Sequence, residues 1–223
     1  MTQYYSESLS AEKLKRCYDI APPRIVQYLK SEIEFVMSHI SPSDRVLELG
    51  CGYGRILTNL TLVTHNIVGI DISLQSLLYG QDKVVRRGPS MVQMDAANTG
   101  FKNYSFDNVV CIQNGISAFK LDPISLFKES LRITKSGGRC FYSTYSRKIW
   151  KDRLDWFQLQ SDEGLIGEID WSKTGDGTIR CKDGFVATTV SERDFVRYAD
   201  KISATYDIQE VDSSSLFCIL SSS

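Results

Sequence analysis

The chain has 223 residues, of which 42% are hydrophobic and 24% are charged, and its formal net charge is −1 at pH 7. These values are typical of one globular domain with a substantial core, so we expect disorder only at the ends. Without an excess of positive charge, the chain lacks the overall field that draws a protein to nucleic acids or anionic membranes. No apolar run approaches the roughly 18 residues that span a bilayer, and no signal-peptide pattern is present. We therefore expect no membrane association and a cytoplasmic location.

The six cysteines do not form a metal-binding pattern. None belongs to a C-x-x-C pair, and the only histidines are His39 and His65, so the clustered ligands that a metal requires are missing. We expect no metal and reduced thiols within the core.

Residues 1–43 predict a helical cap. A short helix over residues 12–18 ends at Ala21-Pro22-Pro23, and a second helix begins at Pro23, where a missing N–H costs little. Apolar side chains recur along this second helix at helical spacing: Ile25, Tyr28, Leu29, Ile33, Val36 and Ile40.

Residues 44–144 alternate between short apolar runs and helical segments. Strands are predicted at residues 46–49, 66–71, 91–94, 107–112 and 139–144. Helices follow Gly54, Ser73 and Asp122-Pro123, and the last of them is expected to end at Gly137-Gly138. Such alternation predicts a parallel sheet with helices on both faces.

The C-terminal part of the chain closes differently. Ser191 caps a helix that runs to Ala199, and two strands follow at residues 206–211 and 216–220. The loop between these strands is so short that they must pair antiparallel.

Residues 145–190 are far longer than an ordinary connection of about 2–6 residues. They contain all three tryptophans, and glycine-rich breaks at residues 174–177 and 182–184 separate short strand-like pieces, which predicts a small β meander. We expect a single domain in four parts: the helical cap (1–43), a central core (44–144), a β-rich lid insertion (145–190), and a closing helix with a β-hairpin (191–223).

The most informative segment is Glu48-Leu49-Gly50-Cys51-Gly52-Tyr53-Gly54, which lies between the first predicted strand and the following helix. Glycines in such a turn let a ligand approach the backbone closely. The dinucleotide pattern G-x-G-x-x-G is not met, because Arg55 occupies the position of its last glycine. A tight turn without a ligand is the alternative interpretation.

Two aspartates follow the next two predicted strands. Asp71 ends the second strand and can accept hydrogen bonds from both hydroxyls of a ribose. Asp95 ends the third strand and can accept from an adenine amino group, with the small Ala96 leaving space for the ring. Either aspartate alone could be a turn or cap residue. Together, after this glycine loop, they predict an adenosine ligand.

These residues resemble the class I S-adenosylmethionine-dependent methyltransferases. Lys135-Ser136-Gly137-Gly138-Arg139 before the fifth strand and the terminal hairpin are also similar to that family. The resemblance implies an α/β, Rossmann-like, doubly wound and mostly parallel seven-stranded sheet with an antiparallel C-terminal strand. Residues 1–40 and 145–190 fall outside it.

By this resemblance, S-adenosylmethionine is the cofactor and S-adenosylhomocysteine the product. Glu48 would reach the methionine amino group directly or through water, Asp71 would hold the ribose, and Ile72 would pack on adenine. Asp95-Ala96 would recognise the base, and Gln113 would lie near the methionine end. The implied cofactor-binding residues are Glu48, Gly50, Cys51, Gly52, Gly54, Arg55, Asp71, Ile72, Asp95, Ala96, Gln113 and Asn114.

Methyl transfer from a sulfonium is an in-line displacement that requires alignment and exclusion of water but no fixed residue type. The segment Ile112-Gln113-Asn114-Gly115 lacks the D/N-P-P-Y/F motif of enzymes that methylate base amines, and no cysteine follows a proline. We therefore expect a small-molecule acceptor with a nitrogen, oxygen or sulfur nucleophile, and no nucleic acid.

Residues of the cap and the insertion are candidates for the acceptor side. Tyr4, Tyr5 and Tyr145 are the candidates for catalysis, and the candidates for substrate contact are Tyr18, Arg16, Arg24, Trp156 and Trp171. Plain packing is the alternative for each aromatic side chain, and surface ion pairs are the alternative for the two arginines.

Three alternatives remain open on sequence alone. The chain could methylate RNA or protein, bind the cofactor without catalysis, or be a nicotinamide-dependent oxidoreductase, which the glycine spacing and Asp95-Ala96 argue against. The assembly is expected to be a monomer or a homodimer.

Overall fold

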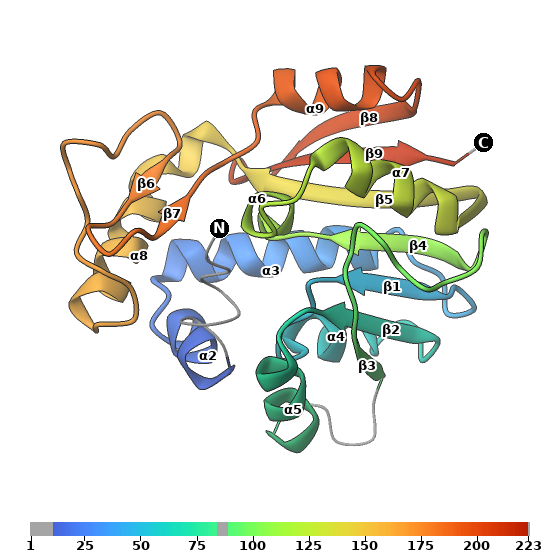
Figure 1. Ribbon diagram of the computed structural model, residues 1–223, viewed down its shortest axis with the longest axis horizontal. Helices are drawn as coiled ribbons and strands as arrows, with labels where there is room; N and C mark the ends of the chain where they lie inside the picture. The colour runs from blue at the N-terminus through green and yellow to red at the C-terminus, as the bar shows by residue number, and fades with distance from the viewer. Residues whose placement is uncertain (1–10, 84–88, 223) are drawn as a thin grey trace.

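A seven-stranded sheet runs through the molecule in the strand order β3-β2-β1-β4-β5-β9-β8 (Figure 1). The computed structural model describes residues 11–83 and 89–222. Within them the strands of this sheet are β1 Val46–Leu49, β2 Ile67–Asp71, β3 Ser90–Gln93, β4 Phe106–Cys111, β5 Thr134–Tyr145, β8 Thr205–Val211 and β9 Ser215–Ser221. Strands β1 to β5 are parallel, and β9 is antiparallel to both β5 and β8. The predicted fold class is confirmed.

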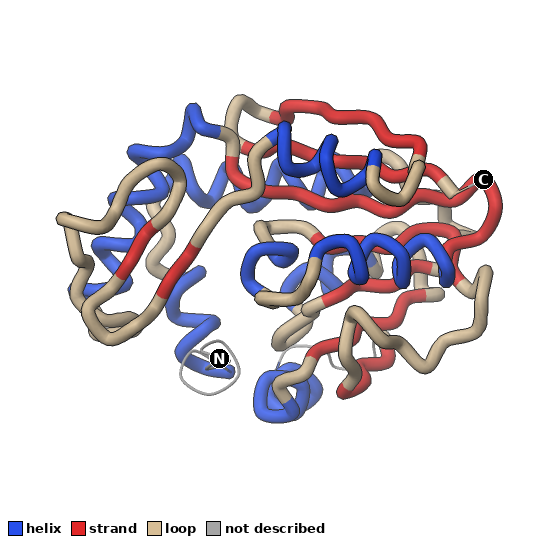
Figure 2. The backbone as a smooth tube through the Cα atoms, turned by 45° about the horizontal axis from the view of Figure 1, so that its top comes forward, coloured by secondary structure: helices blue, strands red, loops and turns tan. Residues whose placement is uncertain are grey.

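Helices cover both faces of this sheet (Figure 2). They are α3 Pro23–Met37, α4 Arg55–Leu60, α5 Leu74–Lys83, α6 Gly115–Ala118, α7 Pro123–Ile133 and α9 Glu192–Asp200. Apolar side chains of α7 and α9 pack together in one core cluster, and those of α3, α4 and α5 pack in another. The sheet is therefore doubly wound, as parallel strands with crossover helices require.

Side-chain caps fix the starts of two helices where the sequence predicts them. Asp122 accepts a hydrogen bond from the Ser125 backbone N–H at 3.0 Å, and Ser191 forms a reciprocal capping box with Asp194. Among the described helices, none has the length and apolar character needed to cross a membrane.

The predicted end of α7 is wrong. The helix stops at Ile133, and Thr134 already pairs with Phe106 of β4 in an extended conformation. Gly138 instead lies within β5, where it allows the close approach of β4: a Cβ at this position would lie 2.5 Å from the Asp107 carbonyl oxygen. The glycine pair thus permits an irregular stretch of strand pairing rather than ending a helix.

The insertion is only partly the predicted β meander. It begins with a 3₁₀ turn (η1 Arg147–Ile149) and a 13-residue helix (α8 Trp150–Asp162), and only then forms the two-stranded sheet of β6 Ile179–Arg180 and β7 Val186–Ala187. The buried positions of α8 are at helical spacing, but two of the four, Arg153 and Gln160, are polar. The apolar periodicity that would have predicted the helix is therefore broken.

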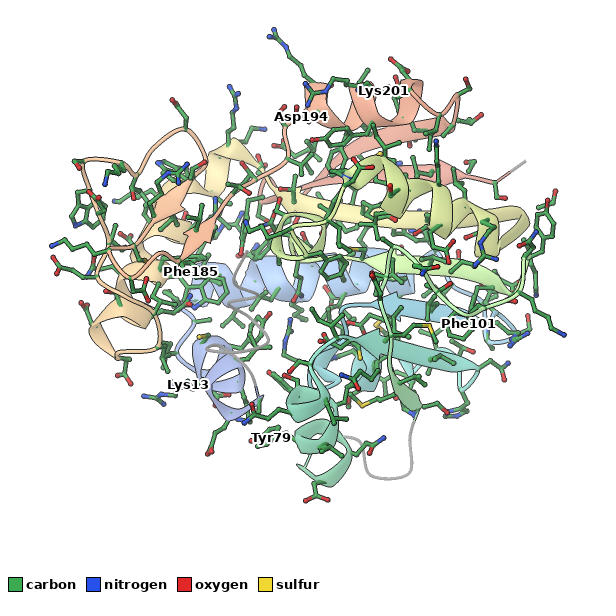
Figure 3. All side chains as sticks on the ribbon, viewed as in Figure 1. Lys13, Tyr79, Phe101, Phe185, Asp194 and Lys201 are labelled. Carbon is green, nitrogen blue, oxygen red and sulfur yellow. The ribbon has the colours of Figure 1, made fainter. Side chains whose placement is uncertain are left out.

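The insertion has a core that it shares with the N-terminal helices. Helix α2 (Ala11–Asp19) lies against it, and the Trp156 indole N–H donates to the Cys17 carbonyl oxygen at 2.9 Å. Phe185, labelled in Figure 3, packs against Phe157 with ring centroids 6.0 Å apart. This third cluster lies beside the end of the sheet where the parallel strands finish (Figure 1).

Candidate functional site

The glycine loop between β1 and α4 is a run of left-handed turns. Gly50, Gly52 and Gly54 have φ angles of 73°, 53° and 86°, which side chains rarely tolerate. The N–H groups of Gly50 and Cys51 both donate to the Ile70 carbonyl oxygen, at 2.8 and 2.9 Å. The loop is thereby pinned across β2, with its three glycines at the positions that need them.

Asp71, at the end of β2, is bonded directly to this loop. Its Oδ2 accepts from the Gly52 N–H at 2.8 Å, and its Oδ1 accepts from the Ser73 N–H at 2.8 Å. Burial raises the pKa of Asp71, while these backbone donors oppose the increase. Each carboxylate oxygen keeps a second lone pair, so the predicted contact with a ribose stays open to this side chain.

Asp95 and Ala96 lie at the same edge of the sheet, after β3. The Met94 N–H donates to the Asp71 carbonyl oxygen at 3.1 Å, which joins the two strand ends. Asp95 is exposed and accepts from the Ala97 N–H at 2.8 Å, while Ala96 is buried. Ile72, the next residue after β2, is 42% exposed. The residues predicted to hold adenosine therefore share one edge, and their contacts with a ligand stay predictions.

Glu48 and Arg55 carry the unsatisfied polar atoms of the loop. Glu48 is only 2% exposed, and burial raises the pKa of its carboxyl to about 8 against the opposing charge of Arg55. Within the part of the chain that the structure describes, Glu48 Oε2 and Arg55 Nε are both buried without a hydrogen-bond partner. Leaving such a group unpaired costs about 1–3 kcal/mol, so a ligand that satisfies both atoms would bind here favourably.

Gln113 follows β4 and reaches the same place. Gln113 and Asn114 have left-handed φ angles of 57° and 63°. The Arg55 guanidinium donates to Gln113 Oε1, which places Gln113 beside the first residue of α4. That Gln113 lies near the methionine end of a cofactor stays a prediction. The Asn114 amide instead donates to the Thr188 carbonyl oxygen at 2.8 Å and accepts from the Thr144 hydroxyl at 2.9 Å. Asn114 thus ties the insertion to β5, and its role at the cofactor stays a prediction.

Two functional candidates were not found from the sequence. A Cβ on Gly50 would lie 2.3 Å from the ring of Phe119, so this ring covers the loop. Glu32 of α3 is wholly buried and accepts from the Gln113 N–H at 2.7 Å. The sequence feature that could have indicated Glu32 is an acidic residue between Leu29 and Val36 on the apolar face of α3.

Several tyrosines of the N-terminal helices and β5 lie near Gln113 and Arg55. Tyr28 and Tyr145 stack with ring centroids 4.9 Å apart, and the Arg153 guanidinium lies 4.4 Å from the Tyr145 ring centroid. The Tyr18 ring is 4.1 Å from the Arg55 guanidinium. Burial raises the pKa of Tyr145, so its hydroxyl is protonated at neutral pH. Tyr4 and Tyr5 lie outside the described residues.

The other substrate candidates have structural partners. Arg16 pairs with Glu163 at 2.8 Å, and Arg24 pairs with Asp212 at 2.5 Å, so both form the ion pairs that the sequence left open. Trp156 is 4% exposed and packed, whereas Trp171 is 59% exposed and lies between α8 and β6. All six cysteines are unpaired and buried.

Helix α2 joins the two halves of this site. Its first residue, Ala11, donates its N–H to the Ser76 hydroxyl of α5 at 3.0 Å, and its Leu14 lies next to Gly52. Lys13 and Tyr79 mark α2 and α5 in Figure 3. Because Cys17 also accepts from Trp156 of α8, this helix bridges the loop and the insertion.

Comparison with known proteins agrees with this geometry. Residues 47–142 match a family described as a methyltransferase domain. The chain is 30% identical over 117 residues to YqeM of Bacillus subtilis (strain 168), which is named as a methyltransferase, covering 51% of this chain and 47% of that protein. It is 27% identical over 108 residues to the ubiquinone biosynthesis O-methyltransferase of Aliivibrio fischeri (strain MJ11), covering 47% and 45%. The chain thus spans about half the length of the curated relatives it matches.

A solved structure extends the likeness to the whole fold. Magnesium protoporphyrin IX methyltransferase from Synechocystis PCC 6803, crystallised with bound S-adenosylhomocysteine, superposes with a TM-score of 0.63. The superposition covers 99% of this chain and 96% of that one at 17% identity. It therefore shows a common fold and does not show a common function.

Proposed function

Because residues 47–142 match a methyltransferase-domain family, we propose that the chain is a class I S-adenosylmethionine-dependent methyltransferase that transfers a methyl group to a small molecule. The nucleophile is a nitrogen, oxygen or sulfur atom, and the displacement is in line. The observation that carries the proposal is the pair of buried, unpartnered atoms beside the glycine loop, Glu48 Oε2 and Arg55 Nε.

These two atoms fit the amino-acid end of the cofactor. The Glu48 carboxylate would accept from its ammonium group, and the Arg55 guanidinium would donate to its carboxylate. Gly50 and Gly52 would lie against the backbone of the ligand, and Asp71 would accept from the ribose hydroxyls. Ile72, Asp95 and Ala96 would hold the adenine ring. When bound, the cofactor supplies an electrophilic methyl group.

The remaining work falls to residues of the cap, β5 and the insertion. Tyr18, Tyr28 and Tyr145 would line the acceptor side with flat, largely apolar surfaces and would exclude water from the reacting atoms. Such walls suit a planar small molecule better than a polymer. The names of the matched ubiquinone biosynthesis and protoporphyrin methyltransferases agree with this choice.

The test combines cofactor binding with an acceptor panel. Purified protein is titrated with S-adenosylhomocysteine, and transfer of a labelled methyl group is then followed into phenols, amines, thiols, bulk RNA and denatured protein. Label in a small molecule supports the proposal. Label only in RNA or protein overturns the acceptor class, and tight binding without any transfer favours a cofactor-binding protein.

Glu48→Gln tests the amino-acid end separately. The variant keeps the shape of the side chain but loses the charge that would meet an ammonium group. We expect the affinity for S-adenosylhomocysteine to fall by roughly tenfold or more, while adenosine, which lacks that group, binds as before. Equal losses for both ligands would contradict the assigned role.

A further inference from the structure

Glu32 is a wholly buried carboxylate outside the segment that matches the methyltransferase family. Its Oε2 accepts from the Gln113 backbone N–H at 2.7 Å and from the Ser143 hydroxyl at 2.8 Å. Its Oε1 accepts from the Ser215 hydroxyl at 2.5 Å. A buried carboxylate is tolerated only where donors like these replace water. An apolar side chain would fill the inward face of α3 without them, so packing alone does not account for an acid here.

The residue that Glu32 holds is itself in an unusual conformation. Gln113 and Asn114 are consecutive non-glycine residues with φ angles of 57° and 63°. Such conformations persist only where the surroundings fix them. Glu32 fixes the Gln113 main chain, and the Leu29 carbonyl oxygen, one turn earlier on α3, accepts from Gln113 Nε2 at 3.1 Å.

The far end of the Gln113 side chain reaches the cofactor loop. Gln113 Oε1 accepts from the Arg55 guanidinium, which also lies 4.1 Å from the centroid of the Tyr18 ring. A continuous path of hydrogen bonds therefore runs from Glu32 through Gln113 to Arg55. It ends beside Glu48 Oε2 and Arg55 Nε, the unpartnered atoms of the loop.

We infer that Glu32 is a positioning residue for the cofactor: by fixing Gln113, it sets the place of the Arg55 guanidinium and strengthens binding of an amino-acid group that Glu32 does not touch. The inference rests on the proposed function, because the ligand concerned is the methionine end of S-adenosylmethionine. Helix α3 thereby acts on a ligand bound at β1 and α4.

The test is Glu32→Gln, titrated with S-adenosylhomocysteine and with adenosine. Glutamine keeps the size of the side chain but has only one accepting oxygen. It cannot accept from the Ser215 hydroxyl with one oxygen and from the Gln113 N–H and the Ser143 hydroxyl with the other, as Glu32 does. We expect the affinity for S-adenosylhomocysteine to fall by about tenfold and the affinity for adenosine to stay unchanged. A merely structural role would lower thermal stability without separating the two ligands.

A double-mutant cycle with Gln113→Leu checks the path. The leucine removes the amide that holds Arg55, so Gln113→Leu alone is expected to weaken S-adenosylhomocysteine binding and spare adenosine. In that background Glu32→Gln should add little. Fully additive losses would overturn the inference, and so would a Gln113→Leu protein that binds S-adenosylhomocysteine like wild type. The result for Gln113→Leu alone tests the inference even if the Glu32→Gln protein fails to fold.

Ser215→Ala is the matched control. It removes a hydrogen bond from the same carboxylate but from Oε1, so the bond from Gln113 to Oε2 remains. Its S-adenosylhomocysteine affinity should stay within about twofold of wild type. If the wild-type protein binds neither ligand, the proposed function fails; if it binds both and Glu32→Gln does not separate them, only the role of Glu32 fails.

Discussion

The proposed cofactor side and the proposed acceptor side of the site differ in how they are built. The proposed cofactor side consists largely of backbone groups of the β1–α4 loop, held by left-handed glycines and by Asp71. On the acceptor side, side chains from α2, α3, β5 and α8 meet in a separate core that few main-chain features define. A site made of backbone groups tolerates few substitutions, because the residues must permit the backbone conformation. A site made of side chains can change its lining residues without a change of fold.

This difference predicts separable effects for substitutions in the glycine loop and substitutions in the insertion. Changes at the loop should alter cofactor affinity with modest effects elsewhere. Changes in the insertion should alter stability and acceptor use while leaving the cofactor bound. The predictions below are ordered by the size of the effect expected.

Gly50→Ala should have the largest effect. Its Cβ would lie 2.3 Å from the Phe119 ring at a φ angle of 73°, so the substitution would displace the loop that is proposed to hold the cofactor. We expect calorimetry to show a loss of S-adenosylhomocysteine affinity of roughly 100-fold or more. Gly164→Ala is the control, because Gly164 has a φ of 68° with nothing within 4 Å of its Cβ. It should lose about 1 kcal/mol of stability and no affinity; equal binding losses would refute the steric argument.

Arg153→Leu should destabilise the insertion by about 2–4 kcal/mol. The wholly buried guanidinium donates to the carbonyl oxygens of Gly177 at 2.8 Å and Ala187 at 3.1 Å, and the leucine would leave both without that donor. Thermal unfolding measures the loss, and titration with S-adenosylhomocysteine should give an unchanged affinity. Weaker cofactor binding in a folded variant would show that the two sides are not independent.

Asp71→Ala should weaken cofactor binding by about 1–3 kcal/mol, because the ribose acceptor and the anchor of the Gly52 N–H are both lost. Adenosine and S-adenosylhomocysteine should lose affinity equally, since both contain the ribose. Asp71→Asn, which keeps one accepting oxygen, should lose less. An unchanged adenosine affinity for Asp71→Ala would remove Asp71 from the ribose site.

The last expected effect concerns the pH dependence of stability rather than ligand binding. Burial raises the pKa of Glu32 to about 7 and that of Glu48 to about 8, from 4.5. A raised carboxyl pKa contributes stability that is present below pH 4.5 and is lost as pH rises through the folded value. The free energy of unfolding from urea titrations should therefore decline between pH 5 and pH 8.

Glu32→Gln should make that decline shallower. Glu210→Gln is the control, because hydrogen bonds from Lys148 and Ser146 lower the pKa of Glu210 and move its titration below this window. An identical slope for wild type and Glu32→Gln would show that Glu32 is ionised throughout.

The sequence predicts the glycine loop between β1 and α4 well because the backbone conformation restricts residue choice there. Gly50, Gly52 and Gly54 are needed for their φ angles, and Asp71 is the last residue of β2. The proposed acceptor side has no comparable sequence motif. Its helix α8 buries the polar residues Arg153 and Gln160, so its apolar residues do not recur at helical spacing. Glu32 was missed for the same reason, since a polar residue on a buried face looks like an interruption of the pattern.

The position of β9 has a consequence for biosynthesis. This strand lies between β5 and β8, yet it follows both in the chain, and it pairs with β5 from Arg139 to Tyr145. While the ribosome is still translating residues 215–221, β5 has an unpaired backbone edge. Such an edge can pair with another nascent chain. A premature stop before Ser215 would therefore be expected to yield aggregates rather than a smaller folded enzyme.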